Sequence, residues 1–453
     1  MPLSSYELAD VHPIILDILS RTPVEIKLRH PRAILSMAFC LFIIGATQKL
    51  VEMKDELLFI IRNSDLPQPQ KDALEGEYEL LISFLEYNRI SDMSRHHRRS
   101  LELLGGPARL ISPKSIWTFG SPSILYLYWR QVGKLDEELA EMDECMPIYY
   151  RLSNGHGSGA ELIMRAEANM MRGDLDKAIP LCYQALFVAT QSHQDSIYQC
   201  GLFALCRLAF QQGDLLEMDR MLCSMREMAD LHREDLSRYT YDLAVSYMSV
   251  IRGDPDHVAP WLAAGDISDK RLVMMVQPLA HIIYGRYLLM NREYHKLLGV
   301  SQYFMGLSSV FPNLLAQVYT RIYCAVAMDA LGKRADAVSH LQTAVDLAMA
   351  DRIYLPFAEM YWDIRYLLPS VLMELESRQQ IEHMAAAFCH VETEESESFT
   401  PRERQILILL KENLTNKEIA ERIGISPNTV RNSVSAMLKK RGFKTRVQLQ
   451  KME

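Results

Sequence analysis

The sequence is poor in the residues that mark strands, disulfides and membrane spans. Only 20 of its 453 residues are glycine and 19 are proline, and 9% are aromatic, whereas 25 are methionine. Its eight cysteines form no Cys-x-x-Cys pair and mostly sit in apolar runs, which favours reduced, buried thiols. The longest apolar run, residues 33–44, is far shorter than the ~20 residues of a membrane span, and no signal peptide is visible. We therefore expect a helical, cytoplasmic protein with no membrane partner.

The usual motifs of catalysis are missing as well. The sequence contains no His-Glu-x-x-His, no Gly-x-Ser-x-Gly, no phosphate-binding loop ending in Gly-Lys-Ser/Thr and no Cys/His metal spacing. We expect no catalytic residue, no metal and no cofactor, and hence a protein that is not an enzyme. Hydrophobic residues make up 49% of the chain and charged residues 23%, which are the proportions of a folded protein.

Charge is divided unevenly along the chain. The last 55 residues, 399–453, hold 12 Lys and Arg against 5 Asp and Glu, a net charge of +7. The other 398 residues hold 37 against 52, a net charge of -15, so the overall value of -8 conceals two bodies of opposite sign. Residues 392–398 between them are acidic and polar without an apolar side chain, which predicts a linker over 391–398.

The large acidic body repeats one sequence pattern. Each unit has an apolar helical run, then a glycine or asparagine with polar neighbours, and then a second helical run. Four marker glycines are spaced by 40 residues, and further markers extend the series in steps of 38 to 45. Glycine supplies the positive φ that ends a helix, and Asn tolerates it. The period predicts eight helix–turn–helix units stacked into a tetratricopeptide-like superhelix with a concave face; an irregular helical array is the alternative. The markers are Gly45, Asn88, Gly133, Gly173, Gly213, Gly253, Asn291 and Gly332.

Two segments interrupt this period. The first is a Gly/Pro-rich loop over residues 105–122 that contains Trp117 and Phe119. The second surrounds Gly155, His156 and Gly157, and it could offer backbone N–H groups to an anion. Long loops in a compact array are often functional. These five residues are therefore candidate ligand contacts, with irregular connections between helices as the plainer reading.

The small basic body carries the start signals of four helices. A Thr or Ser cap followed by Pro, or by Glu or Gln three residues later, occurs four times. A tight turn over residues 424–426 separates a short helix (417–423) from a longer one (427–441), which is typical of a helix-turn-helix. The four caps are Thr400, Thr415, Ser426 and Thr445.

Helical spacing assigns the faces of the third helix. Val430, Val434, Met437 and Leu438 form an inward stripe that would pack on the first two helices. The opposite face offers Asn428, Arg431, Asn432 and Ser435, and such side chains read base edges in the major groove. The candidates for phosphate contacts are Lys417, Thr429, Lys439, Lys440, Arg441 and Lys444. A solvated basic helix is the alternative, but the charge of +7 coincides with a complete helix-turn-helix pattern.

The stretches Thr-Asn-Lys-Glu-Ile-Ala-Glu-Arg-Ile-Gly-Ile-Ser (415–426) and Asn-Thr-Val-Arg-Asn-Ser-Val-Ser-Ala-Met-Leu-Lys-Lys (428–440) resemble the LuxR-type DNA-binding domain of bacterial regulators. The resemblance implies that the third helix enters the major groove and that Arg431, Asn432 and Ser435 meet base edges. That family often has Lys where Arg431 stands and His where Ser433 stands. The large body resembles the helical sensor arm of MalT-like regulators, chiefly at residues 22–35 and 117–159. The ATP-hydrolysing module of those regulators is absent from this sequence.

Together these patterns predict an all-α chain with three parts: a helical-repeat sensor or interaction domain (1–390), the acidic linker (391–398) and a four-helix LuxR-type helix-turn-helix domain (399–453). We expect a bacterial transcription regulator that binds double-stranded DNA as a homodimer. Its repeat arm would bind a small effector or a protein partner. A helical-repeat interaction scaffold with accessory DNA binding is the alternative.

Overall fold

The computed structural model describes residues 5–232, 235–268, 271–310, 312–397, 406–407, 409–411, 414–423, 425–440, 445–446 and 449. Every regular element in these ranges is a helix, which confirms the all-α class. The chain divides into two compact units, Met1–Ala385 and Ala386–Glu453, so the first unit ends slightly before the predicted residue 390. No helix in the described part of the chain is long and apolar enough to cross a bilayer.

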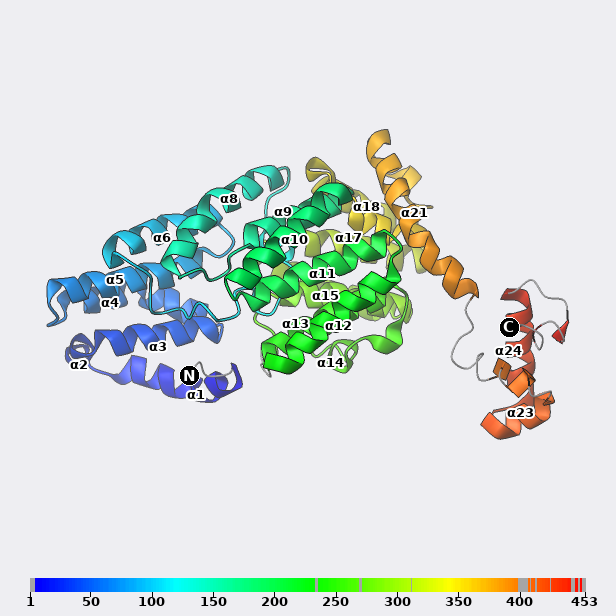
Figure 1. The fold of residues 1–453 in the computed structure, drawn as a ribbon, viewed down its shortest axis with the longest axis horizontal. Helices are drawn as coiled ribbons and strands as arrows, with labels where there is room; N and C mark the ends of the chain where they lie inside the picture. Colours follow the sequence, from blue (N-terminus) through cyan, green and yellow to red (C-terminus); the bar gives the residue numbers. More distant parts are fainter. Residues whose placement is uncertain are drawn as a thin grey trace. The chain divides into compact units, whose positions relative to one another are not determined.

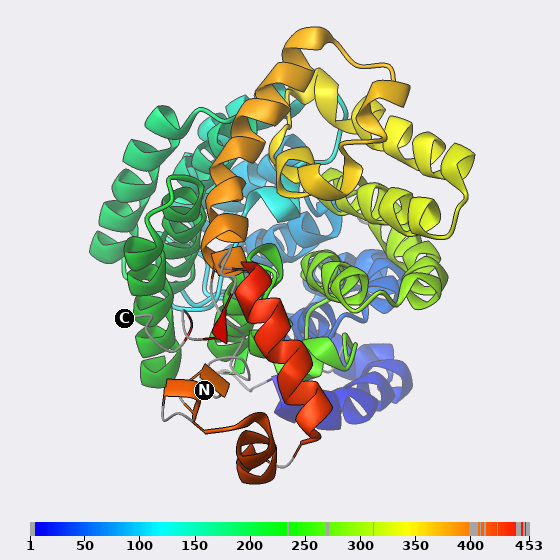
Figure 2. The ribbon, with the colours of Figure 1, turned by 90° about the vertical axis from the view of Figure 1, so that its right-hand side faces the viewer.

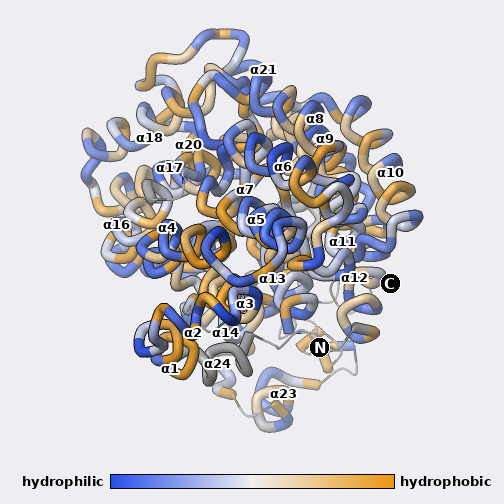
Figure 3. The backbone as a smooth tube through the Cα atoms, turned by 90° about the vertical axis from the view of Figure 1, so that its left-hand side faces the viewer, coloured by the Kyte–Doolittle hydropathy of each residue, from blue (hydrophilic) through white to orange (hydrophobic). Residues whose placement is uncertain are grey.

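The helices of the first unit follow one another in a curved array (Figures 1 and 2). Most are amphipathic, and Figure 3 shows apolar and polar residues alternating along them. The α-helices up to the middle of the array are α1 (Ser5–Arg21), α2 (Val24–Arg29), α3 (Pro31–Ile43), α4 (Thr47–Asn63), α5 (Gln68–Ser83), α6 (Ile90–Leu104), α7 (Leu125–Tyr128), α8 (Leu135–Leu152), α9 (Ala160–Arg172), α10 (Leu175–Gln191) and α11 (Asp195–Gln211).

The array continues with α12 (Leu215–His232), α13 (Asp235–Ile251), α14 (Pro260–Ala263), α15 (Gln277–Met290), α16 (Tyr294–Val310), α17 (Leu314–Ala330), α18 (Arg334–Ala348), α19 (Leu355–Glu359), α20 (Tyr361–Ile364) and α21 (Leu375–Glu397). The short 3-10 turns are η1 (Phe84–Glu86), η2 (Pro255–His257), η3 (Met349–Asp351) and η4 (Leu368–Ser370). The second unit holds α23 (Asn416–Ile423) and α24 (Pro427–Lys440).

The predicted turns fall where the markers placed them, with one correction. The six marker glycines have φ between 73° and 84°, and Asn88 has φ 54°. Asn291, however, is an ordinary cap with φ -84°, and the left-handed residue is Arg292 with φ 58°. Arg292 lies 40 residues before Gly332 and occupies the matching position after its helix. The geometric period is therefore more regular than the sequence markers suggested.

Two of the eight predicted units lack one long helix. Before Gly133 the only helix of its unit is the four-residue α7, and after Gly253 the chain forms η2, the four-residue α14 and turns. Pro255 and Pro260 explain the second case, because proline removes a backbone donor and tends to break a helix. The predicted acidic linker, 391–398, is helical as far as Glu397, because α21 continues to that residue. Glutamate has a high helix propensity, so such a stretch can remain helical without an apolar face.

Residues 117–131, here called the central segment, run through the interior of the first unit. Thr118, Ser121 and Ser123 are completely buried, and Trp129 is 1% exposed. Figure 2 draws this cyan stretch inside the curve formed by the green and yellow helices. The segment contains only one helical turn, α7, so side chains must satisfy much of its backbone.

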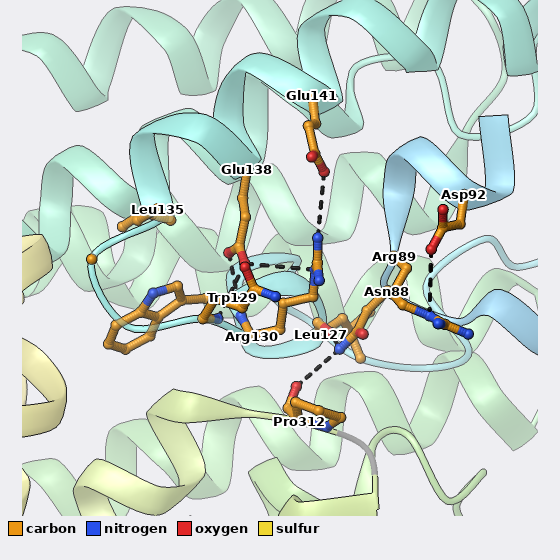
Figure 4. A network of polar contacts seen from close by, with 12 residues as sticks. Asn88, Arg89, Asp92, Leu127, Trp129, Arg130, Leu135, Glu138, Glu141 and Pro312 are labelled. Atoms are coloured by element: carbon orange, nitrogen blue, oxygen red, sulfur yellow. Dashed lines mark hydrogen bonds and ion pairs between the residues drawn. The ribbon is translucent and has the colours of Figure 1, made fainter. Parts of the chain in front are cut away.

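Helices on both sides of the central segment supply those hydrogen bonds. Glu167 on α9 accepts the backbone N–H groups of Ile124 and Leu125 at 2.9 and 2.8 Å. Its burial raises the pKa of its carboxyl group, while these N–H donors act in the opposite direction. Glu138 on α8 accepts the next pair of backbone N–H groups, those of Arg130 and Gln131 (Figure 4).

Two asparagines hold the middle of the segment. Asn313, the N-cap of α17, donates its side-chain amide to the carbonyl oxygen of Tyr126. Asn88 donates to the carbonyl oxygen of Pro312 at 2.9 Å and, more weakly, to that of Leu127 at 3.4 Å (Figure 4). The central segment therefore joins parts of the repeat array that are more than 200 residues apart in sequence.

A buried carboxylate completes these contacts. Asp351 is 4% exposed and accepts the indole N–H of Trp129 at 3.1 Å. It also accepts the backbone N–H groups of Gly133 at 2.7 Å and Leu135 at 2.9 Å. One side chain from η3 thus fixes the end of the central segment and the beginning of α8.

Candidate nucleic-acid interface

The caps of the second unit confirm two of the four predicted helix starts. Thr415 and Glu418 form a reciprocal capping box: the backbone N–H of Thr415 donates to Glu418 Oε2 at 2.7 Å, and the N–H of Glu418 donates to Thr415 Oγ1 at 3.3 Å. The first of these bonds lowers the pKa of the exposed Glu418 carboxyl. Ser426 caps α24 by accepting the N–H of Thr429 at 3.1 Å. The start predicted at Thr400 lies outside the described residues.

Apolar side chains fix the angle between α23 and α24. Val430, Val434 and Met437 on α24 are at most 7% exposed. They share one core with residues of the segment 406–410, with residues of α23 and with Leu449. Leu438 is partly buried against this core. The inward stripe is confirmed. The rest of this core consists of Ile406, Leu407, Leu409, Leu410, Ile419, Ala420 and Leu449.

The opposite face of α24 is polar and open to solvent. Asn428, Arg431, Asn432 and Ser435 are all exposed, as is Thr429 at the beginning of the helix. Their spacing along 14 residues of helix places them on the side away from the core. This arrangement matches the face that the sequence predicted for base contacts.

The predicted phosphate contacts can be placed only in part. Lys417 is exposed in the first turn of α23. Lys439 and Lys440 belong to the last turn of α24, but their side chains lie outside the described part of the structure, as do Arg441 and Lys444 altogether.

A hollow of about 550 Å³ opens where α23 and α24 begin. It brings Lys417 together with Asn428 and Arg431, so a predicted phosphate contact and two predicted base contacts line one surface. Asn432 and Ser435 are not among its lining residues. The complete lining is Leu414, Thr415, Asn416, Lys417, Pro427, Asn428, Arg431 and Arg446.

Arg446 is a residue that the sequence reading missed. Its guanidinium donates to the side-chain oxygen of Asn416 and to the carbonyl oxygen of Leu414, at the beginning of α23. Burial lowers the pKa of Arg446. Arg446 lies 30 residues from Asn416 in sequence, so no local pattern indicated this contact.

The candidate ligand contacts of the first unit are used within the fold. A Cβ on Gly157 would lie 2.5 Å from the ring of Trp117, so the indole packs directly on the glycine backbone. His156 contacts the hydroxyl of Tyr149 at 2.8 Å, and its burial lowers the pKa of the imidazole to about 4. Phe119 packs edge-on against Phe42, with ring centroids 6.3 Å apart.

The backbone N–H groups that would have bound an anion already have partners. Gly157 N–H donates to the side-chain oxygen of Gln194 at 2.7 Å, and Gly155 N–H donates to the carbonyl of Tyr150 at 2.8 Å. The structure brings Trp117, His156 and Gly157 together, although the sequence placed them in two separate segments, and it uses their polar groups in internal contacts.

The comparisons with known proteins agree with the geometry of the second unit. Residues 397–452 match the family described as "Bacterial regulatory proteins, luxR family". A putative HTH-type transcriptional regulator of Mycobacterium tuberculosis is 44% identical over 52 residues, which cover 12% of this chain and 6% of that protein.

Two further relatives have matches of similar length. The nitrate/nitrite response regulator NarL of Escherichia coli K12 is 51% identical over 49 residues, and the transcriptional activator DevR/DosR of M. tuberculosis is 49% identical over 49 residues. In both cases the match covers 11% of this chain and 23% of the relative, so this chain spans less than a quarter of either protein. Residues 397–452 therefore form a LuxR-type helix-turn-helix domain, a DNA-binding module of transcription regulators.

Proposed function

We propose that this protein is a bacterial transcription regulator that reads operator DNA with α24. The observation that carries the proposal is the division of α24 into two faces: Val430, Val434 and Met437 are buried, whereas Arg431, Asn432 and Ser435 are exposed. Arg can form two hydrogen bonds with guanine, and Asn can form two with adenine. Lys417 and the basic end of α24 would contact phosphates and set the register.

The helical-repeat arm would act as the sensor. Repeat arrays present an extended surface built from many units, and effectors change output only if they bind one arrangement of the protein better than another. In this chain the inner side of the array is occupied by the central segment. A small effector or protein partner would accordingly bind the outer helices or act on the central segment itself. The free cysteines of the arm, such as Cys200 and Cys206, suit a reducing cytoplasm.

The test of the proposal is selection of DNA by the full-length protein from a pool of random duplexes. A dimeric reader should enrich two inverted half-sites whose centres are about one helical turn apart. Enrichment without a common sequence would show binding to phosphates only and would contradict base reading.

An interaction scaffold is the second candidate, because the repeat array makes up most of the chain. In that case a partner protein should be captured equally well by the full chain and by a chain that ends before residue 399. DNA selection should then yield no preferred sequence.

A further inference from the structure

The beginning of α23 is held in place by Arg446 in a way that neither the capping box nor the core provides. The reciprocal bonds between Thr415 and Glu418 lie within one stretch of chain, so they shape the first turn of α23 without fixing its place relative to α24. The core holds α23 through Ile419 and Ala420, which are its fourth and fifth residues. The first turn is therefore tied to the rest of the unit by other contacts.

The guanidinium of Arg446 bonds to the chain on both sides of the N-cap Thr415. Its Nη2 donates to the carbonyl oxygen of Leu414, and its Nη1 donates to the side-chain oxygen of Asn416, the first residue of α23. Because a guanidinium offers its donors in a rigid fork, two such bonds set both the position and the orientation of this turn. The other end of the tie is anchored as well, since Leu449, three residues further along, is completely buried in the core that α23 and α24 share.

The turn that Arg446 holds carries a predicted phosphate contact. Lys417 follows Asn416 directly, and its side chain is exposed. Lys417, Arg431 and Arg446 line the same hollow, and its described lining contains no carboxylate. The hollow therefore has a positive lining, which favours the anionic backbone of DNA. Arg446 differs from the other two cations because both of its terminal nitrogens donate to oxygens of the protein.

We propose that Arg446 is a positioning residue for DNA binding: it places the first turn of α23 so that Lys417 meets a phosphate, and it does not contact DNA itself. The proposal rests on the proposed function, because it requires that this hollow face DNA. Its physical basis is preorganisation, since a group that is already in place loses less freedom when it binds. Loss of Arg446 should therefore remove the phosphate contact of Lys417 and leave base reading by Arg431 intact.

A double-mutant cycle between Arg446→Ala and Lys417→Ala tests this role in the full-length protein. Affinity is measured by fluorescence anisotropy at several salt concentrations, for the selected operator and for a scrambled duplex. Substitutions that disturb the same contact are not additive, whereas independent substitutions add. The matched control is Arg422→Ala, which removes a cation from the last turn of the same helix, outside the lining of the hollow. Its effect should add to that of Lys417→Ala.

We expect Arg446→Ala to make the slope of log affinity against log salt shallower by about 1, as Lys417→Ala does, and the double variant to lose no more than either alone. The ratio of operator to scrambled affinity should stay within about twofold of that of the unchanged protein, because Arg431 is untouched. A double variant whose slope is shallower by about 2 would overturn the proposal, since Arg446 would then be a phosphate contact of its own. An unaltered slope in Arg446→Ala, or loss of its operator preference, would overturn it too.

Asn416→Ala keeps the test decisive if thermal unfolding shows that Arg446→Ala does not fold. It removes one of the two acceptors and leaves the guanidinium in place. We expect a smaller loss of slope in the same direction, again not additive with Lys417→Ala, and full additivity would contradict the positioning role. The salt slope can be measured on any duplex. Absence of sequence preference in the unchanged protein would therefore count against the proposed DNA reading alone and would leave the coupling measurable.

Discussion

The helices that hold the central segment in the arm and the outer face of α24 use the same kinds of side chain in opposite ways. Asn313 is 5% exposed and its amide is bonded to the backbone of the arm, whereas Asn432 is exposed to solvent. The difference is one of available partners: a polar group in the interior must be satisfied by the protein, while one on the surface can be satisfied by water until a ligand replaces it. Polar residues of the arm interior therefore maintain the fold, and those of α24 are available for recognition.

The largest loss of stability should come from Asp351→Ala in the interior of the arm. The substitution leaves the indole N–H of Trp129 and the backbone N–H groups of Gly133 and Leu135 buried without an acceptor. We expect the free energy of unfolding to fall by about 3–5 kcal/mol. Urea unfolding measures it, with Asp346→Ala on the exposed side of α18 as the control; similar values for the two variants would remove Asp351 from its structural role.

Lowering the pH should weaken the arm through its buried histidines. His281 is 3% exposed and stacks on Phe304, and burial lowers the pKa of its imidazole to about 3. An unfolded histidine has a pKa near 6.5, so below that pH the unfolded chain takes up a proton that the folded chain does not. Stability is thus complete above about pH 6.5 and is lost as the pH falls.

This pH effect can be isolated by His281→Leu. Between pH 7.5 and pH 5 the histidine should cost about 2 kcal/mol, and the variant should lose that much less stability over the same interval. Unfolding at several pH values measures the slope, with the exposed His295→Leu as the control. An unchanged slope in His281→Leu would show that this side chain does not resist protonation in the fold.

A change at Lys417 should affect DNA binding and leave stability alone. Lys417→Ala removes one exposed cation from the hollow between α23 and α24. If it contacts a phosphate, affinity should fall for every DNA sequence, and the slope of log affinity against log salt should become shallower by about 1. Titrations at several salt concentrations test this, and an unaltered slope would exclude Lys417 from the phosphate contacts.

The smallest effect is expected in the turns of the array. Arg292 adopts φ 58°, which strains a residue with a side chain, so Arg292→Gly should stabilise the arm by up to about 1 kcal/mol. Gly332→Ala, at the equivalent turn with φ 76°, should destabilise it by a similar or larger amount. Thermal unfolding compares the two, and the same sign for both would contradict the assigned geometry.

The sequence predicted the second unit more completely than the first, for a physical reason. The caps at Thr415 and Ser426 act over three residues, and the stripe from Val430 to Met437 follows from the pitch of one helix. Contacts between residues that are close in sequence can be predicted from a local sequence pattern. The contact of Arg446 with Asn416 spans 30 residues and was not predicted.

The central segment shows what local patterns cannot reveal. The loop around Trp117 was recognised as unusual, and the turns at Gly173 and Gly213 were placed correctly. Nothing in the sequence paired Asn88 with Pro312, or Asp351 with Trp129, because these partners are separated by more than 200 residues. The burial of the central segment was not predicted for the same reason, because the groups that satisfy its backbone come from distant helices of the array.

The most direct test of the account is how well Arg431→Ala distinguishes DNA sequences. Affinity is measured by fluorescence anisotropy for the selected operator and for a scrambled duplex of the same length and composition, with the unchanged protein and the variant at one salt concentration. If Arg431 reads a base, the variant should lose about 1–3 kcal/mol on the operator and much less on the scrambled duplex. Equal losses on both would mean that α24 contacts only phosphates, and would contradict the claim that its exposed face reads sequence.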